Sequence, residues 1–469
     1  MLLAALVVLS RASLCTASLC SVNPTPPQES EDRLGAVASL DARCSAIGVD
    51  ILRKGGNAAD ATVAAQFCSG VIGMYNTGIS GGSFMLIRDS ARRFEFVDFR
   101  ETVPAASSET MFNNNVTASI LIPGEIRGLQ YLHSKYGSLP WEKLVDPSVK
   151  LARDGFLVGT DFESQMDRID DQSLFLDPIW APEFSPQGRR LMAGDLMKRP
   201  KYAETLEIIR DRGPDAFYSG FIASTMVAAL QDNNGVMRLE DLQDYQVVNR
   251  QLRSIQYDGY RITGGGSPAG GVVSLSILNA LKGYSDRDQQ SAVNLTSHRL
   301  SEIMRFAFGA VTYQTGDPKF VDGLELYEEA MLSQEFAAEI RGKISDEHTQ
   351  PVEAYNPDGL ESLETPGTAH ISAADASGLA ISLTSTINLT FRSRLMVPES
   401  DVEVNTASQV LVQNGFDNGT VAYLEERGHT VVWVESGHGS DLQLVRRLPN
   451  GAFDAASEPR QAQSGGFAV

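Results

Sequence analysis

The residues with the clearest chemical potential lie around Thr368, where a polar segment meets a strand-forming one. Residues 340–367 are rich in proline, glycine and acidic side chains, a composition typical of exposed linkers that are easily cut. From Thr368 to residue 389, two runs of alternating apolar and polar residues flank a turn-forming tetrad at 375–378, which predicts a β-hairpin. Thr368 would therefore begin a strand directly behind a cleavable linker.

The length of the hairpin loop decides which residue faces Thr368. A loop of two residues places Thr368 opposite Ser385, and a loop of three residues places it opposite Thr386. In either register the hydroxyl groups of residues 384–386 lie beside Thr368.

A threonine in this setting can cut its own chain. Its hydroxyl oxygen attacks the carbonyl of Gly367, the peptide bond shifts to an ester, and water hydrolyses the ester. The α-amine released at Thr368 then serves as general base for the hydroxyl of the same residue. The alternative is that these hydroxyl groups decorate an ordinary sheet surface, since threonine is common in strands.

Two helices are expected ahead of this hairpin, over residues 36–54 and 58–75. Cys44 and Cys68 each lie twelve residues from Gly56, so an antiparallel helical hairpin brings them to the same height. That geometry permits a disulfide, which would contribute about 3 kcal/mol by closing the intervening loop. Two reduced, buried cysteines are the alternative.

Further along the chain the patterns indicate ordinary structure. Apolar strands are expected at 84–87 and 94–97 around a polar turn, and the glycine-rich run 264–271 is expected to form a backbone turn before a helix. His298 and Glu302, four residues apart on an expected helix, resemble half of a metal site. Because no further metal-ligating residue is near these two in the sequence, an ordinary surface pair is the preferred interpretation.

Composition limits the function classes. The 469 residues carry a net charge of −20, which excludes nucleic acid as a partner because phosphate binding needs clustered Lys and Arg. The apolar run at residues 2–9 fits a signal peptide, with a short membrane anchor as the alternative. Glycosylation motifs that favour a secretory route begin at Asn115, Asn294, Asn388 and Asn418.

The hairpin motif also resembles a known family. Residues 368–372, Thr-Ala-His-Ile-Ser, and 385–389, Ser-Thr-Ile-Asn-Leu, are similar to the processing-site signature of the gamma-glutamyltransferases, also called glutathione hydrolases. Similar landmarks occur at 55–61, 78–82, 98–101, 122–128 and 316–322. Together they extend the resemblance over residues 34–398.

The resemblance implies an α/β (α+β) fold, namely the αββα sandwich of the N-terminal-nucleophile hydrolases. Residues 1–20 would form a signal peptide or anchor, 21–367 a large subunit and 368–469 a small subunit, both within one globular domain. The substrates would be glutathione and other gamma-glutamyl compounds, with water, amino acids or peptides as acceptors, and no metal or organic cofactor is implied. The protein would be extracellular, on the cell surface or in the vacuole.

Roles for individual residues also follow from the resemblance. Thr368 would be the nucleophile, exposed by self-cleavage between Gly367 and Thr368, and Thr386 would support it. Arg100 matches the arginine that binds the substrate α-carboxylate, a role suited to a guanidinium group. Asn388 matches the amide near the substrate α-amino group.

The resemblance is interrupted after Glu399. The family continues there with acidic residues that hold the substrate α-ammonium and a glycine pair that binds the oxyanion, and neither is recognisable here. The tail from Asn405 resembles the end of the family again, and only 102 residues follow the expected cut. An internal deletion is the simplest explanation, and we expect little or no gamma-glutamyl transfer from the chain as it stands. A catalytically impaired relative and an amide or cephalosporin acylase of the same superfamily are the alternatives; Arg100 favours an α-amino acid substrate.

Overall fold

The computed structural model describes residues 33–108, 121–169, 173–176, 178, 180–313, 316–357, 368–388, 391, 409–413, 416–434 and 442–469. The expected leader at 1–20, the sequon at Asn115, Gly367 and the interruption at 399–408 lie outside these ranges. The chain folds as two compact units. The first, the sheet unit, is formed by residues 24–249, 365–401 and 441–469, and the second, the helical unit, by residues 1–23, 250–364 and 402–440.

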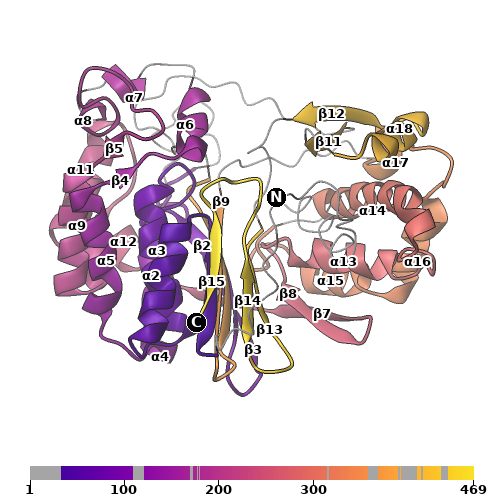
Figure 1. Cartoon of the computed structure of the whole chain (residues 1–469), viewed down its shortest axis with the longest axis horizontal. Coiled ribbons are helices and arrows are strands. Elements are labelled where there is room, and N and C mark those ends of the chain that lie inside the picture. Colours follow the sequence, from indigo (N-terminus) through magenta and orange to yellow (C-terminus); the bar gives the residue numbers. More distant parts are fainter. Residues whose placement is uncertain are drawn as a thin grey trace. The chain divides into compact units, whose positions relative to one another are not determined.

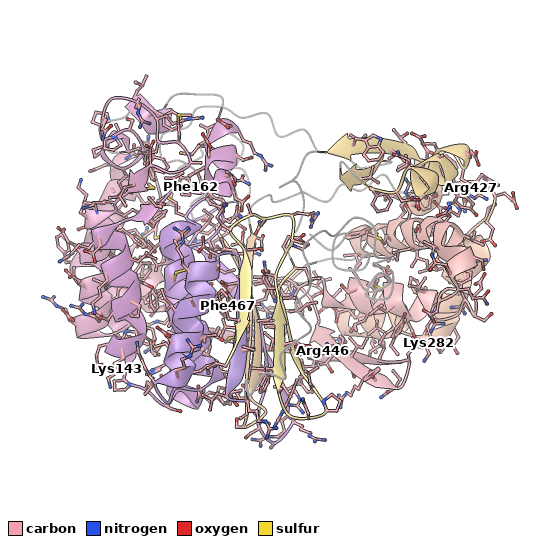
Figure 2. All side chains as sticks on the ribbon, in the orientation of Figure 1. Lys143, Phe162, Lys282, Arg427, Arg446 and Phe467 are labelled. Carbon is pink, nitrogen blue, oxygen red and sulfur yellow. A yellow bond between two sulfur atoms is a disulfide. The ribbon has the colours of Figure 1, made fainter. Side chains whose placement is uncertain are left out.

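The sheet unit is organised around a seven-stranded sheet with the strand order β15-β1-β9-β10-β2-β3-β6 (Figure 1). Its strands are β1 (Gly35–Ser39), β2 (Gly82–Arg88), β3 (Phe94–Phe99), β6 (Val248–Arg250), β9 (Thr368–Asp375), β10 (Ala380–Thr386) and β15 (Gly465–Ala468). The β2–β3 hairpin matches the predicted pair of strands. Phe467, labelled in Figure 2, lies on the edge strand β15, and the residue is 42% exposed.

Helices α2 (Ala42–Arg53) and α3 (Ala58–Ile72) pack beside this sheet. The prediction of one helix over 36–54 was wrong at its start, because residues 35–39 form the buried strand β1. The helix begins only after Asp41, whose side chain accepts a hydrogen bond from the backbone N–H of Arg43. Asn57 caps α3 in the same way, within a reciprocal capping box with Asp60.

Cys44 on α2 and Cys68 on α3 are joined by a disulfide, with their Cα atoms 5.3 Å apart. Both residues are fully buried. The bond therefore ties together the two helices that lie against β1, β9 and β10.

Further helices and short strands complete the sheet unit. They are α4 (Glu125–Tyr136), α5 (Trp141–Asp154), β4 (Phe156–Leu157), α6 (Thr160–Asp167), α7 (Ser173–Leu176), α8 (Ala181–Phe184), β5 (Leu196–Met197), α9 (Pro200–Arg212), α10 (Asp215–Tyr218), α11 (Phe221–Asp232), α12 (Leu239–Gln243), β13 (Leu444–Arg447) and β14 (Phe453–Ala456). The β13–β14 hairpin contacts β1, and β13 also contacts β9, so a second β layer covers part of the main sheet.

The helical unit has its own apolar core, which includes Ile277, Ile303, Ala307 and Met331. Its elements are β7 (Leu252–Tyr257), β8 (Tyr260–Gly265), α13 (Gly271–Leu281), η3 (Gln290–Ala292), α14 (Val293–Tyr313), α15 (Leu324–Met331), α16 (Gln334–Lys343), α17 (Val352–Tyr355), β11 (Gln409–Gln413), α18 (Asn418–Glu426) and β12 (Thr430–Val434). The glycine-rich run forms the turn between β8 and α13, as predicted.

The interpretation of His298 and Glu302 as a surface pair was wrong. Both side chains lie on α14 and are completely buried. Their packing partners come from segments far away in the sequence, which local periodicity does not reveal.

Within the described ranges, no helix combines the length and apolar character needed to cross a membrane.

Candidate active site

The β9–β10 hairpin fixes the position of Thr368. The backbone N–H of Asp375 donates to the carbonyl of Leu379, and Gly378 in the loop between them has a φ of +91°. The loop therefore contains three residues, and Thr368 pairs with Thr386. Of the two registers that the sequence allowed, the structure has the second, in which Thr368 faces Thr386 instead of Ser385.

Thr368 lies in a row of neighbouring residues at the strand ends, and this row crosses the sheet. Thr386 on β10 pairs with Thr368 on one side and with Gly82 of β2 on the other. Arg100 follows β3 directly and continues the row, since Phe99 pairs with Ser83. A Cβ atom on Gly82 would lie 2.5 Å from the carbonyl oxygen of Phe99, so the close approach of these strand ends requires glycine.

Hydrogen bonds connect polar groups of the residues along this row. The guanidinium group of Arg100 donates to the amide oxygen of Asn388 at 2.5 Å. The backbone N–H of Asn388 in turn donates to the hydroxyl oxygen of Thr386 at 2.9 Å. Asn388 adopts a left-handed backbone conformation with a φ of +70°, which is tolerated best by glycine and asparagine. The structure thus brings together all four residues predicted for the site: Thr368, Thr386, Arg100 and Asn388.

The Arg100 side chain is held from several sides and still meets solvent. Its Nε lies 3.3 Å from a carboxylate oxygen of Glu101, and its guanidinium carbon lies 5.5 Å from the centre of the Phe84 ring. The hydroxyl of Tyr245 donates to the Arg100 backbone carbonyl at 2.7 Å. With 29% of its side chain exposed, Arg100 is a positioned cation that can still bind an anion.

His370 lies on the same face of β9 as Thr368, two residues further along. One ring nitrogen is 2.8 Å from the Thr384 hydroxyl, and the other is 3.2 Å from the hydroxyls of Ser372 and Ser382. Burial lowers the pKa of His370 to about 4, so the ring is neutral near pH 7. It fixes the neighbouring hydroxyl groups and carries no charge.

A buried network beneath the row was not predicted from the sequence. Glu125 on α4 accepts hydrogen bonds from Ser83 at 2.5 Å and from Ser385 at 3.0 Å. The Ser385 hydroxyl also lies 2.6 Å from that of Thr77. Burial raises the pKa of Glu125 to about 7. The available signal was a carboxylate placed among the apolar, inward-facing positions of α4.

The family described as Gamma-glutamyltranspeptidase matches residues 44–410. A glutathione hydrolase of Aspergillus flavus is 40% identical, with 93% of this chain and 90% of that protein covered. A glutathione hydrolase proenzyme of Arthroderma benhamiae is 37% identical, with 95% and 94% covered. The Aspergillus alignment spans 533 positions, more than the 469 residues of this chain, so that relative has residues without a counterpart here.

Solved structures of related proteins have the same fold. A cephalosporin acylase from Bacillus halodurans superposes with a TM-score of 0.80 at 21% identity, covering 93% of this chain and 96% of that one. A gamma-glutamyltranspeptidase from Helicobacter pylori gives a TM-score of 0.65 at 25% identity, covering 70% and 96%. These likenesses confirm the predicted N-terminal-nucleophile hydrolase fold. By the extent of the sequence match and by its fold, the chain belongs to the gamma-glutamyltranspeptidase family of enzymes.

Proposed function

We propose that this chain cuts itself between Gly367 and Thr368 and that Thr368 then attacks gamma-glutamyl compounds such as glutathione. The observation that carries this proposal is the row at the strand ends, in which Thr368 faces Thr386 and a hydrogen-bonded chain runs from Thr386 through Asn388 to Arg100. One end of the row offers a nucleophile, and the other offers a cation.

Self-cleavage needs only local groups. The Thr368 hydroxyl attacks the Gly367 carbonyl, the peptide becomes an ester, and water releases the two pieces with a free α-amine on Thr368. We propose that the pieces stay together. β1 and β2 precede the cut, whereas β9 and β10 follow it, and these strands pair with one another in the main sheet.

Turnover uses the whole row. The Thr368 hydroxyl attacks the γ-carbonyl, the α-amine accepts its proton and passes it to the leaving nitrogen, and cysteinylglycine leaves when glutathione is the substrate. The backbones of Thr368 and Arg100 are three strand spacings apart, about 14 Å. The long side chain of Arg100 shortens that gap, because it reaches back to Asn388. A gamma-glutamyl group would lie between them, with its α-carboxylate on Arg100 and its α-ammonium near Asn388.

The glutamyl ester is then passed to water or to the amine of an amino acid or peptide. This step and the first attack both develop an oxyanion, and removing one oxyanion donor typically costs a factor of about 10² to 10³ in rate. The longer Aspergillus relative supports our view that this chain lacks part of the site. We therefore propose that the chain cuts itself but turns over slowly.

An acylase is the second candidate, because a cephalosporin acylase shares the fold. A matched pair of anilides separates the two activities. Gamma-glutamyl anilide carries an α-ammonium group, and glutaryl anilide lacks only that group. We expect the chain to prefer gamma-glutamyl anilide, with no release from Thr368→Ala. A preference for glutaryl anilide would favour the acylase.

We further propose that the chain is exported to an extracellular or vacuolar compartment. The buried Cys44–Cys68 disulfide is of the kind that persists in oxidising compartments. Among the described sequons, Asn418 is exposed, whereas Asn294 is half-buried and Asn388 contacts Arg100 in the candidate site. Asn418 is therefore the better glycan acceptor, and Asn418→Gln should remove a glycosidase-sensitive increase in mass.

A further inference from the structure

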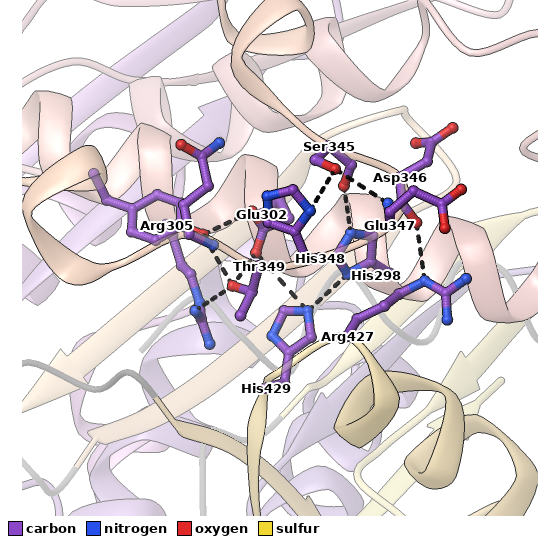
Figure 3. Close-up of polar contacts among 12 residues, drawn as sticks. His298, Glu302, Arg305, Ser345, Asp346, Glu347, His348, Thr349, Arg427 and His429 are labelled. Carbon is purple, nitrogen blue, oxygen red and sulfur yellow. Dashed lines mark hydrogen bonds and ion pairs between the residues drawn. The ribbon is translucent and has the colours of Figure 1, made fainter.

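A second cluster of chemically capable side chains lies in the helical unit, apart from the row at Thr368. His298 and Glu302 are one turn apart on α14, and His429 lies between α18 and β12 (Figure 3). Nδ1 of His298 is 2.7 Å from Nε2 of His429, which is 3.8 Å from a carboxylate oxygen of Glu302. The three ligand atoms all lie within 4.8 Å of one another, and no side chain of the three is more than 4% exposed.

Backbone hydrogen bonds hold His429 in place. Gly428, just beyond the end of α18, has a φ of +84°, a conformation that favours glycine, and the N–H of His429 donates to the Leu424 carbonyl at 3.2 Å. The N–H of Thr349 donates to the Arg427 carbonyl at 2.7 Å, which ties the loop after α16 to the same point. The imidazole is therefore carried by a rigid helix end.

The hydrogen bonds also determine where the protons are. Nε2 of His298 lies 2.8 Å from the Ser345 carbonyl oxygen, which can only accept, so this nitrogen carries the proton. Nδ1 of His298 consequently presents a lone pair to His429. Among the residues that the structure describes, the buried Nδ1 of His429 has no hydrogen-bond partner. The His429 ring therefore lacks an outer partner that would oppose a change of tautomer.

The Glu302 carboxylate is oriented by two hydroxyl groups. One oxygen accepts from Thr349 at 2.7 Å, and the other accepts from Tyr355 at 2.7 Å. Imidazoles and carboxylates whose outer atoms are held by carbonyl and hydroxyl groups are what metal sites use, and His298 and Glu302 are held in this way.

We propose that His298 Nδ1, His429 Nε2 and the Glu302 carboxylate bind one divalent transition-metal ion of the zinc type. Two imidazoles and one carboxylate are a ligand set that zinc accepts, with a fourth position for water. Tetrahedral bonds of about 2.0–2.1 Å to nitrogen separate the ligand atoms by roughly 3.3 Å. Two of the three separations, 2.7 and 3.8 Å, lie on either side of that value, and all three are within 4.8 Å, so side-chain shifts are needed to seat the ion. His429 then carries its proton on Nδ1.

The site has a consequence for the cut chain. His298 and Glu302 precede residue 367, and His429 follows it. A metal ion held by all three joins the two pieces that self-cleavage would produce. Metal binding itself does not depend on the cut, so failure of the proposed activity and failure of the metal site are separate outcomes.

The test is metal binding by the full chain after removal of metals with a chelator. Co²⁺ serves as the probe because its visible absorption reports tetrahedral nitrogen and oxygen ligands, and Zn²⁺ is then added to displace it. We expect one ion per chain in the parent and in His348→Asn, whose exposed histidine lies just outside the cluster. His429→Asn and Glu302→Gln should lose the spectrum. Tyr355→Phe removes only an outer hydroxyl and should weaken binding by about 10- to 100-fold.

Two results would overturn the proposal. One is a parent chain that binds no Co²⁺ or Zn²⁺, which would leave the histidine pair as a hydrogen bond between α14 and His429. The other is equal binding by the parent and a folded His429→Asn variant. If the variants do not fold, X-ray absorption of the Zn²⁺-loaded parent decides the question. Two imidazole nitrogens in the first shell support the site, and a shell of oxygens alone contradicts it.

Discussion

The row at Thr368 and the cluster at His298 are built by different means. The row is set by strand register, its side chains are joined by single hydrogen bonds, and Arg100 remains 29% exposed. The cluster is set by a helix and a helix end, and its three side chains are almost completely buried. A site that must admit substrate leaves bonding capacity open to solvent. A buried cluster satisfies most of its groups internally, so we expect it to contribute to assembly instead of turnover.

The largest effect should come from restoring the segment that is missing after Glu399. We expect a version that carries the family's residues missing after Glu399 to release a gamma-glutamyl anilide at least about 10² to 10³ times faster than the chain as it stands, because oxyanion donors are restored. Initial rates of the two purified proteins measure this. Comparable rates would mean that the shortened chain already holds these donors.

The next effect concerns Arg100, at the exposed end of the row. Arg100→Ala should weaken binding of gamma-glutamyl anilide by about 2–5 kcal/mol, because its α-carboxylate loses a charged partner, and should leave self-cleavage unchanged. The assay uses the completed version and compares gamma-glutamyl anilide with 4-aminobutyryl anilide, which lacks only the carboxylate. The variant should no longer discriminate between them. Arg93→Ala, which removes a largely exposed arginine side chain, is the control, and an unchanged preference in Arg100→Ala would remove Arg100 from the site.

Glu125 offers a test of whether buried ionisable groups near the row govern the free energy of unfolding. Its pKa is raised from 4.5 to about 7, so the folded state binds the proton more tightly than the unfolded state does. Stability is therefore lost as the pH rises from 4.5 through 7, by about 3 kcal/mol in total. Glu125→Gln cannot ionise and should show a flatter profile. Denaturant unfolding at pH 5, 6.5 and 8 measures the slopes, and parallel profiles would contradict this role.

The disulfide should have an effect of similar or smaller size. Replacing Cys44 and Cys68 together by alanine should lower the free energy of unfolding by about 3 kcal/mol, because the unfolded chain regains loop entropy. Self-cleavage should persist, since the hydrogen bonds of β9 and β10 remain. Unfolding of the parent with and without a reductant provides the matched comparison. Equal stability in all three states would show that the bond contributes little.

The sequence revealed the row better than the cluster, for a physical reason. Alternation over residues 368–389 is local and fixes a hairpin to within two registers, but the choice between them depended on the conformation of Gly378. Strand β1 was missed because five small, buried residues have no strand period to read. His429 could not be paired with His298 from sequence, since 131 residues separate them and only tertiary packing brings them together. Glu125 was hidden for the same reason.

The most direct test of the central claim is the mass and N-terminal sequence of the purified fragments. We expect the parent to give two pieces, the smaller one beginning at Thr368, and Thr368→Ser to cut as well because it keeps a hydroxyl group. Thr368→Ala should remain a single chain. A small fragment that begins elsewhere, or a Thr368→Ala chain that is still cut at residue 368, would contradict the assignment of Thr368 as the nucleophile.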